Sequence, residues 1–182
     1  AFQGANLLSS ITIPASVTDI GTLAFDGTNS LTSITIPASV TSIEQNAFYS
    51  NGITNFVVAT ANNTYSSENN VLFNKGKTTL IRFLSNSTGE YVVPSSVTTI
   101  SEFAFAQRNI TGLVLPAGLQ NIEPYALVGA SGLASVNIPE SLTIIGPYAF
   151  ASTSALRSIT FPATVIGIDA SAFGYSAFSK EL

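Results

Sequence analysis

Carboxylates and cations are the residues of this sequence that could do chemistry, and both are sparse. Ten Asp and Glu residues and six Lys and Arg residues occur among 182. Glu44, Glu102 and Glu123 each follow an isoleucine by one or two positions. A glycosidase needs two carboxylates about 5 Å or roughly 6.5–9.5 Å apart across a cleft, and a calcium site needs about six to eight oxygen ligands. Because no Asp-x-Asp-x-Asp run is present, the sequence favours neither kind of site.

The absence of His and Cys excludes most other catalytic and metal-binding chemistry. It excludes a Ser-His-Asp triad, a Cys-His pair, zinc held by His or Cys, haem held by His, iron–sulfur clusters held by Cys, and disulfides. A serine activated by Lys or Tyr stays formally open, but no motif supports it. We therefore expect no enzyme, no metal and no cofactor.

The charge distribution argues against nucleic acids and membranes as partners. The net charge is −4 and the isoelectric point is about 4.5. The six cations are scattered and form no basic stripe or patch: Lys75, Lys77, Arg82, Arg108, Arg157 and Lys180. Binding to the backbone of nucleic acids or to anionic lipid needs such a patch. No run of 18 or more apolar residues occurs, so we expect no direct membrane insertion.

An internal repeat of about 23 residues organises the chain. Residues 11–14 (ITIP) recur at 34–37, 23 positions later. Related quartets end in Pro at 91–94, 113–116, 136–139 and 159–162, at steps of 22 or 23. A second marker, Ala-Phe or Ala-Leu, occurs at 1–2, 24–25, 47–48, 104–105, 126–127, 149–150 and 172–173. A fixed period of roughly 20–29 residues is typical of leucine-rich repeats.

Each repeat predicts one short strand, a second extended segment and a tight turn. In repeat 31–53, Leu31, Ile34 and Ile36 alternate with polar residues, which is the pattern of a half-buried strand. Pro37 lacks an N–H group and ends that strand. One repeat cannot bury its apolar face, whereas stacked repeats can. We therefore predict a leucine-rich-repeat solenoid of the α/β horseshoe class, predominantly β with short 3₁₀ or α turns.

The step from Phe48 to Phe105 predicts one degenerate repeat and an insertion. Residues 62–70 are polar and are predicted to form a loop, whereas 71–73 and 80–83 flank a Gly-containing turn and predict a β-hairpin. We predict a single domain, 1–182, with a partial repeat at 1–7, repeats at 8–58, the hairpin insertion at 59–90 and repeats at 91–182. Because the first marker stands at Ala1, we expect an excerpt of a longer protein.

The repeat LxSITIPxSVTxIxxxAF resembles the BspA-like leucine-rich-repeat family of bacterial and some protist surface proteins. The block NxxYSSxxxVLFNKxKTTLIRF, residues 62–83, is also similar to an element of that family. The resemblance implies a right-handed solenoid, usually exported, and several members act as adhesins. Family repeats often carry Cys a few residues after Ala-Phe. Those positions here hold Thr28, Asn51, Arg108, Ala130 and Thr153.

The outward positions of the predicted strands form the first candidate binding face. They are Ser10, Thr12, Ser33, Thr35, Asn55, Val57, Gly112, Val114, Ser135, Asn137, Ser158 and Thr160. Within this set the candidate binding residues are Ser33, Thr35, Asn55, Ser135, Asn137, Ser158 and Thr160, whose hydroxyl and amide groups suit a protein or glycan. The alternative is a plain solvated face. An ice-binding Thr ladder is disfavoured because Val and Asn interrupt it.

The predicted hairpin is the second candidate, since loops on rigid scaffolds often carry recognition residues. Its candidates are Tyr65, Lys75, Lys77 and Arg82. The alternative is a structural insertion that covers the edge of the core. Three N-x-T sequons begin at Asn62, Asn86 and Asn109, and they matter only in a glycosylating secretory pathway.

These observations predict a non-enzymatic binding or adhesion module that is extracellular or on the cell surface. Its partner would be a protein or glycan on a host or neighbouring cell. The alternative is a structural spacer or a self-assembling filament element, with end-to-end self-association through open strand edges. An adhesin should show a clustered aromatic or charged patch on one face, whereas a spacer should show only uniform Ser, Thr and Asn.

Overall fold

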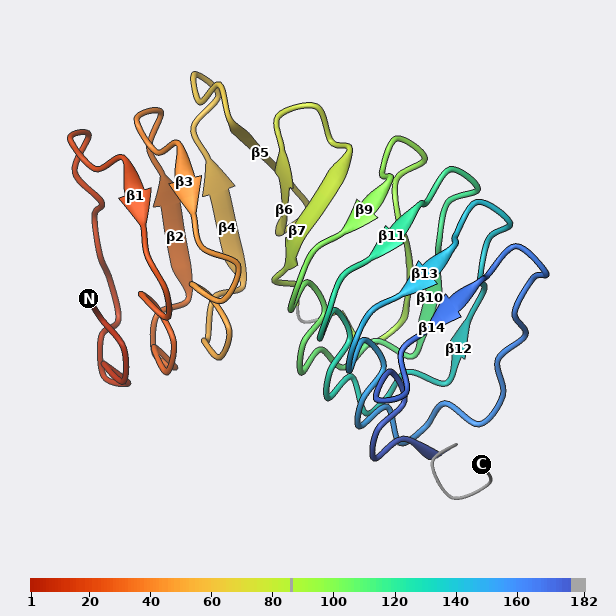
Figure 1. Cartoon of the computed structure of the whole chain (residues 1–182). Helices are drawn as coiled ribbons and strands as arrows, with labels where there is room; N and C mark the ends of the chain where they lie inside the picture. Colours follow the sequence, from red (N-terminus) through yellow and green to blue (C-terminus); the bar gives the residue numbers. More distant parts are fainter. Residues whose placement is uncertain (86, 178–182) are drawn as a thin grey trace. The chain divides into compact units, whose positions relative to one another are not determined.

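The chain divides into two compact units, Ala1–Ser85 (unit 1) and Asn86–Leu182 (unit 2). The computed structural model describes residues 1–85 and 87–177, so the last part of the predicted repeats, 178–182, lies outside the described residues. The sequence predicted one uninterrupted domain. The division falls inside the predicted insertion 59–90, and each unit is described by itself (Figure 1).

Unit 1 begins with repeats whose strands pair in parallel across one repeat period. The strands are β1 (Asp19–Ile20), β2 (Ser33–Ile36), β3 (Ser42–Ile43) and β4 (Asn55–Val58). Strand β2 pairs with β4 over its whole length, and β1 pairs with β3. Ile34 lies beside Phe56, and both are buried, whereas Thr35 and Val57 beside them are exposed. The predicted alternation of inward and outward residues is therefore confirmed here.

The insertion in unit 1 is an antiparallel three-stranded sheet. Its strands are β5 (Tyr65–Glu68), β6 (Val71–Asn74) and β7 (Thr79–Phe83), paired in the order β5-β6-β7. The predicted hairpin of β6 and β7 is confirmed, but the prediction of a loop at 62–70 is wrong because it contains β5. Asn69 and Asn70 both have positive φ, 50° and 63°. Two such residues in succession form the tight turn that joins antiparallel strands.

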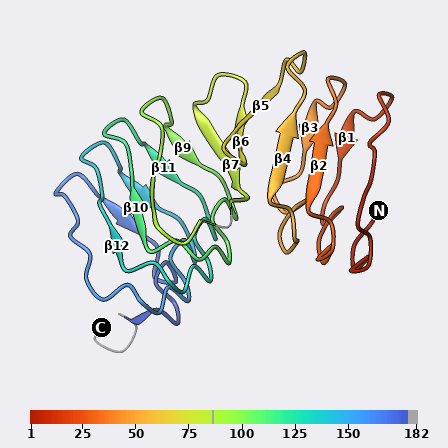
Figure 2. The same ribbon diagram turned by 180° about the vertical axis from the view of Figure 1, so that it is seen from behind.

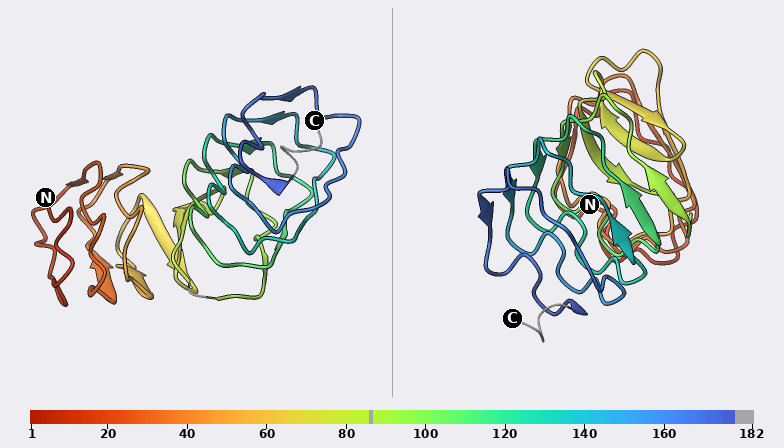
Figure 3. Two further views of the ribbon diagram at one scale, coloured as in Figure 1. Left: turned by 90° about the horizontal axis from the view of Figure 1, so that it is seen from below. Right: turned by 90° about the vertical axis from the view of Figure 1, so that its right-hand side faces the viewer.

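Unit 2 contains two parallel sheets. Strands β8 (Glu90–Val92), β10 (Gly112–Val114) and β12 (Ser135–Val136) form one sheet. Strands β9 (Thr99–Ile100), β11 (Asn121–Ile122), β13 (Ile144–Ile145) and β14 (Gly167–Ile168) form the other. Each repeat therefore contributes one turn of the coil, here called a rung, and the strands of successive rungs lie side by side (Figure 3).

Two predicted strands do not form. Residues 11–13 in unit 1 and 159–161 in unit 2 are extended, but neither segment is a paired strand. Figure 2 shows β10 and β12 as arrows, whereas the chain that follows in the next rung is drawn as coil. The apolar pattern of these segments is the same as in the paired strands. In unit 2 the neighbouring rung differs, as described below, whereas the rung that follows residues 11–13 contains the regular strand β2.

Stacked aromatic rings fill the core at the Ala-Phe markers. In unit 1, the rings of Phe25 and Phe48 are parallel within 1°, with centroids 5.3 Å apart. In unit 2, Phe150 and Phe173 stack with centroids 5.2 Å apart. The alanines that precede these rings are buried in every repeat from Ala24 onward, which lets the backbones of neighbouring rungs approach. The prediction that stacked repeats bury their apolar faces is therefore confirmed.

The turns around these markers are single turns closed by the 3₁₀ hydrogen-bond pattern, as from the Ala47 N–H to the carbonyl of Glu44 at 3.0 Å, and they also contain left-handed residues. No α-helix forms within residues 1–85 and 87–177, and no helix there could span a membrane. In most repeats the residue two positions after the marker aromatic or leucine has a positive φ; these residues are Gly4, Gly27, Gln107, Gly129, Ser152 and Tyr175. Three of the six are Gly, the residue that tolerates this conformation best. The recurrence of Gly at this position was a signal of the left-handed turn that the repeat pattern alone did not reveal.

This geometry predicts that Ser152→Gly stabilises unit 2. Ser152 has a φ of 58°, which places its Cβ in a strained position. Its N–H donates to the carbonyl of Gly174 at 2.9 Å, and glycine keeps that bond. We expect the free energy of unfolding to rise by about 0.5–1 kcal/mol in urea denaturation, because relief of strain exceeds the extra entropy of the unfolded chain. Ser95→Gly, at an exposed turn position without positive φ, should give no gain.

Candidate functional site

Two adjoining hollows lie on the outward face of the β8-β10-β12 sheet in unit 2. The larger, about 440 Å³, lies between residues 134–140 and residues 158–162. The smaller, about 310 Å³, is lined by Glu90, Leu113 and Val114 as well as by the segment 135–137. Both hollows are lined by residues 135–137, and together they are here called the groove. Of the predicted face, Val114, Ser135, Asn137, Ser158 and Thr160 line it.

Asn137 explains why strand β12 is only two residues long. Its Oδ1 accepts the backbone N–H of Leu115 at 2.7 Å, and its Nδ2 donates to the carbonyl of Leu115 at 3.0 Å. These are the groups that would otherwise pair with the backbone of the next rung. The side chain of Asn137 thus takes the place of its own main chain, and β12 ends at Val136. Although Asn137 is exposed as predicted, its amide is already engaged by the protein.

The far wall of the groove has unpaired backbone groups. Among the described residues, no hydrogen bond joins the backbone of residues 158–161 to that of 135–138, and the hydroxyls of Ser158 and Thr160 have no partner. In the paired rungs, an outward residue such as Val114 directs its carbonyl toward the preceding rung, where it accepts from the N–H of Val93 at 2.9 Å. By the same strand geometry, Ser158 and Thr160 direct their backbone groups into the groove.

The groove is acidic. The Glu90 carboxylate lies across Gly112 and beside Ser135, since a Cβ at Gly112 would meet both the Glu90 Oε2 and the Ser135 Oγ at 3.2 Å. Glu140 lines the larger hollow, and its Oε2 accepts from the Thr164 hydroxyl at 3.5 Å. No Lys or Arg in the described part of the chain lines either hollow. The predicted face did not include Glu90, although it pairs with Gly112 and so holds the same outward position as Ser135. Glu140 was not included because it follows Pro139, after the strand has ended.

The other predicted face residues lie on unit 1, where the strand ladder is closed. Ser33, Thr35 and Asn55 are exposed on β2 and β4, as predicted. The Asn55 Nδ2 donates to the Ser33 Oγ at 3.1 Å, which ties the two strands on their outer face. Since β2 and β4 pair over four residues, no backbone donor between them is open to a ligand. This face offers only side-chain hydroxyl and amide groups.

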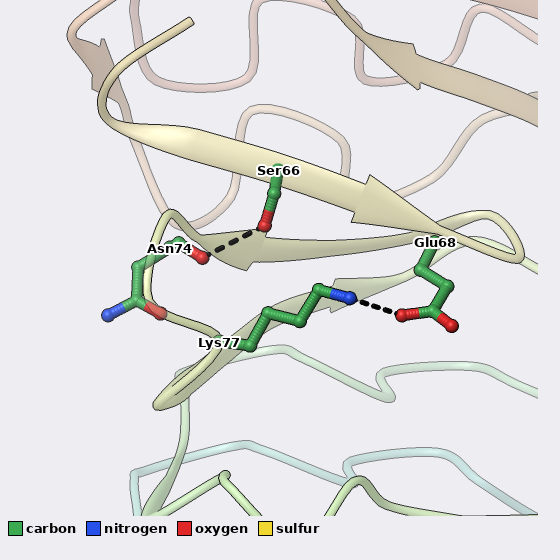
Figure 4. Close-up of polar contacts among 4 residues, drawn as sticks. All are labelled: Ser66, Glu68, Asn74 and Lys77. Atoms are coloured by element: carbon green, nitrogen blue, oxygen red, sulfur yellow. Dashed lines mark hydrogen bonds and ion pairs between the residues drawn. The ribbon is translucent and has the colours of Figure 1, made fainter. Parts of the chain in front are cut away.

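The four hairpin candidates are mostly engaged within unit 1. Arg82 is only 1% exposed, and its Nη2 donates to the carbonyl of Tyr49 at 2.6 Å, so its prediction as a recognition residue is wrong. Lys75 Nζ donates to the carbonyls of Asn62 and Thr60. Lys77 forms an ion pair with Glu68, and the Ser66 hydroxyl donates to the carbonyl of Asn74 nearby (Figure 4). These contacts favour the structural interpretation of the insertion.

Tyr65 joins the insertion to the preceding repeat. Its hydroxyl accepts the N–H of Ile43 at 2.9 Å and lies 3.4 Å from the carbonyl of Thr41, to which it donates. Burial is the main cause that raises the pKa of this phenol above its ordinary value of 10.0, opposed by the Ile43 hydrogen bond and reinforced by Glu44 and Asp19. The protonated hydroxyl is therefore the form that the folded chain favours.

We predict that Tyr65→Phe destabilises unit 1 by about 1–2 kcal/mol near neutral pH, because the Ile43 N–H loses its acceptor. A group whose pKa is raised on folding contributes stability that is complete below its unfolded pKa of about 10 and is lost as pH rises through the folded pKa. The stability difference between wild type and Tyr65→Phe should therefore shrink above pH about 10 in urea titrations. The same difference measured for Tyr175→Phe, an exposed tyrosine, should stay near zero.

The predicted carboxylate positions form no metal or catalytic cluster in the structure. Glu123 Oε2 accepts the backbone N–H of Glu102 at 2.9 Å, and this hydrogen bond stabilises the turn that begins at Glu102. Burial, together with the nearby Glu123 carboxylate, raises the pKa of Glu102 above its ordinary value. Glu44 lies in unit 1 and is exposed. Within the described ranges, no group of three or more acidic residues is placed to hold a metal ion.

The three sequons differ in their surroundings. Asn62 is fully buried with both amide atoms hydrogen bonded, so its nitrogen is closed to a glycan in the folded chain. Asn109 is exposed. Asn86 lies outside the described residues.

Comparisons with known proteins agree on the fold. The family model for the BspA-type leucine-rich-repeat region, six copies long, matches residues 1–91 and 83–180. No curated protein matches the sequence.

Three solved structures of bacterial proteins are similar to this chain. A leucine-rich cell surface protein of Faecalibacterium prausnitzii is 28% identical, with a TM-score of 0.77 over 90% of this chain and 44% of its own. The pneumococcal vaccine antigen PcpA is 25% identical, with a TM-score of 0.74 over 86% of this chain and 45% of its own. A leucine-rich-repeat protein of Bacteroides capillosus is 32% identical, with a TM-score of 0.56 over 62% of this chain and 92% of its own. The chain thus spans less than half the length of the first two.

Proposed function

Because the chain belongs to the BspA-type leucine-rich-repeat family, we propose that it is a non-enzymatic binding module of a surface or secreted protein. It recognises a protein or glycan partner through the outward face of the β8-β10-β12 sheet in unit 2. The similarity to a cell surface protein and to a vaccine antigen supports the placement on the surface. Repeat solenoids commonly use such extended sheet faces for recognition.

The observation that carries the proposal is the groove. It combines a depression of about 440 Å³ with hydroxyls that have no partner in the described chain, at Ser158 and Thr160, and with carboxylates at Glu90 and Glu140. A uniform spacer would show none of this local concentration of unsatisfied polar groups. The two carboxylates of the lining support a binding module over a uniform spacer.

The proposal is tested by screening the immobilised chain against a glycan array and a panel of extracellular-matrix proteins. Two variants accompany the wild type: Ser158→Arg, which fills the groove, and Thr143→Arg, an exposed residue that does not line it. We expect one or more partners to lose at least tenfold in affinity with Ser158→Arg and to bind Thr143→Arg normally. A chain that binds nothing, or partners that bind both variants equally, would contradict the proposal.

A second candidate is end-to-end self-association, as in a filament element. The observation in its favour is the exposure of large apolar side chains on both units. Leu7 is 87% exposed in unit 1, and Ile166 is 83% exposed in unit 2. A hollow of about 570 Å³ lined mainly by apolar residues of the first rung, among them Phe2, Ile11 and Val17, adds to this surface. Light scattering across a concentration series tests it, since association predicts a mass that grows with concentration.

A further inference from the structure

We infer that the groove of unit 2 takes an extended, positively charged peptide segment, which adds as a strand between β12 and residues 158–161. This inference rests on the proposed binding function and names the chemistry of its partner. A peptide bound in this way would donate and accept backbone hydrogen bonds on both sides, as in other cases of strand addition.

The backbone of the groove is arranged for such a strand. Ser158 and Thr160 direct their N–H and carbonyl groups into it, and among the described residues these groups have no partner. On the opposite wall, inward residues direct their backbone groups toward the following rung, as Leu115 does toward Asn137. Val136 and Ile138 hold the same inward positions, so their backbone groups also face the groove. An edge with open donors and acceptors is a template for pairing with another chain.

The apolar ladder is also open at this place. Leu113 and Leu115, on the preceding rung, are 2% and 3% exposed. Val136 and Ile138, which hold equivalent inward positions one rung later, are only partly buried. A regularly paired following rung would cover both. A peptide strand with apolar residues at alternate positions would cover them instead, and its remaining side chains would face outward beside Ser135 and Ser158.

The carboxylates of the groove favour a positively charged peptide. Glu140 lines the larger hollow, between residues 134–140 and 158–162, and Glu90 lines the smaller one, whereas no Lys or Arg of the described chain lines either. Arg157 directly precedes the far wall without lining the hollow. Complementary charge steers binding partners and rejects those of like charge. A peptide with Lys or Arg among its outward side chains therefore fits, whereas an acidic one does not. A glycan would use the hydroxyls but would leave the apolar positions and the open backbone donors uncovered.

The test is selection of binders from a random 12-residue peptide display library on the full 182-residue chain. We expect the enriched peptides to carry net positive charge and to alternate apolar and polar residues. Synthetic copies should lose at least tenfold in affinity when alternate backbone nitrogens are methylated, which removes the N–H donors. On binding, the wild-type amides of Ser158 and Thr160 should become protected from hydrogen exchange.

Two pairs of variants provide the controls. Thr160→Pro removes one groove-facing N–H that has no partner in the described chain, and Thr12→Pro makes the same change at the equivalent unpaired position of unit 1. Glu140→Lys reverses one groove charge, and Glu44→Lys does so at an exposed site in unit 1. We expect at least tenfold weaker binding for Thr160→Pro and Glu140→Lys, and unchanged binding for the other two.

Several outcomes would overturn the inference. Enrichment of neutral or acidic peptides, or of none, would do so, as would binding that is indifferent to N-methylation or to Thr160→Pro. A glycan or a folded protein that binds the groove and is lost in Ser158→Arg would also overturn strand addition, but it would leave the proposed function standing. A chain that binds none of these probes, or that binds its partners equally well as Ser158→Arg, would contradict both.

Discussion

Asn62→Ala should destabilise unit 1 by about 3–4 kcal/mol, far more than the loss of a typical polar residue. Asn62 is fully buried, and its Nδ2 donates to the carbonyls of Pro37 and Val40, both at 2.9 Å. Its Oδ1 accepts the N–H groups of Thr64 and Tyr65, both at 2.8 Å. Alanine would leave two donors and two acceptors without partners in the interior, and each such buried group costs about 1–3 kcal/mol before relaxation.

The measurement for this variant is urea denaturation, with Asn63→Ala as the matched control. Asn63 is the adjacent residue and is exposed, so its replacement should change the free energy of unfolding by no more than about 0.5 kcal/mol. Equal effects of the two variants would show that Asn62 does not join the Pro37 turn to the insertion. The result bears on the organisation of unit 1, because this one side chain links a regular repeat to strand β5.

Phe48→Ala should cost unit 1 about 3–5 kcal/mol, since it removes the central ring of an aromatic ladder. Phe48 is 2% exposed. Its ring stacks on Phe25 at 5.3 Å and meets the edge of Phe56, also at 5.3 Å. The cavity would lie between two rungs that cannot collapse without breaking the parallel strands around them. We therefore expect a penalty toward the upper end of that range.

Phe2→Ala provides the comparison for Phe48→Ala. Phe2 stacks on the same Phe25 at 5.6 Å but is 37% exposed, so its removal should cost less than about half as much. Hydrogen exchange resolved by residue is the appropriate measurement, because in a stack of repeats each rung depends mainly on its neighbours. Loss of protection should be confined to unit 1. An equal loss in unit 2, or equal effects of the two variants, would contradict a ladder built rung by rung.

The regular part of the fold was predictable because the repeat period and the positions of the apolar residues indicate the same architecture. A 22- or 23-residue step with apolar residues at fixed places leaves parallel stacking as the way to bury them, and Ile34 beside Phe56 shows the expected register. The Ala-Phe markers were likewise predictable, since a small residue before a ring suits close backbones. Such repeated positions carry the same information several times, which makes the pattern robust to single exceptions such as Leu127.

The irregular parts were not predictable from that pattern, because single side chains decide them. Arg82 looks like a surface cation in the sequence, yet a backbone carbonyl partner lets it be buried. Asn62 and Asn69 look like loop residues, yet one holds a buried turn and the other takes the left-handed conformation that creates β5. Repeat alignment gives no weight to such choices of hydrogen-bond partner.

The groove is the clearest case of this limit. The residues at 159–161 have the same apolar pattern as the paired strands, so the sequence predicts a strand there. The deviation begins one rung earlier, at Asn137, whose position is Thr or Val in the other repeats. The Asn137 amide reaches the backbone of Leu115 and replaces the main-chain pairing between their two rungs at that point. The available signal was a single Asn at a repeat position that otherwise holds Thr or Val. Only the structure shows that the side chain of this Asn replaces backbone pairing.

Hydrogen exchange of the free chain tests the open rung most directly, since proposed function and peptide inference both depend on it. Leu113 and Leu115 are bonded within the sheet, whereas Ser158 and Thr160 have no backbone partner among the described residues. We predict that the amides of Ser158 and Thr160 exchange near the rate of an unstructured chain and those of Leu113 and Leu115 roughly a hundredfold or more slowly. Comparable protection at all four amides would mean that the rung is closed and would contradict the account.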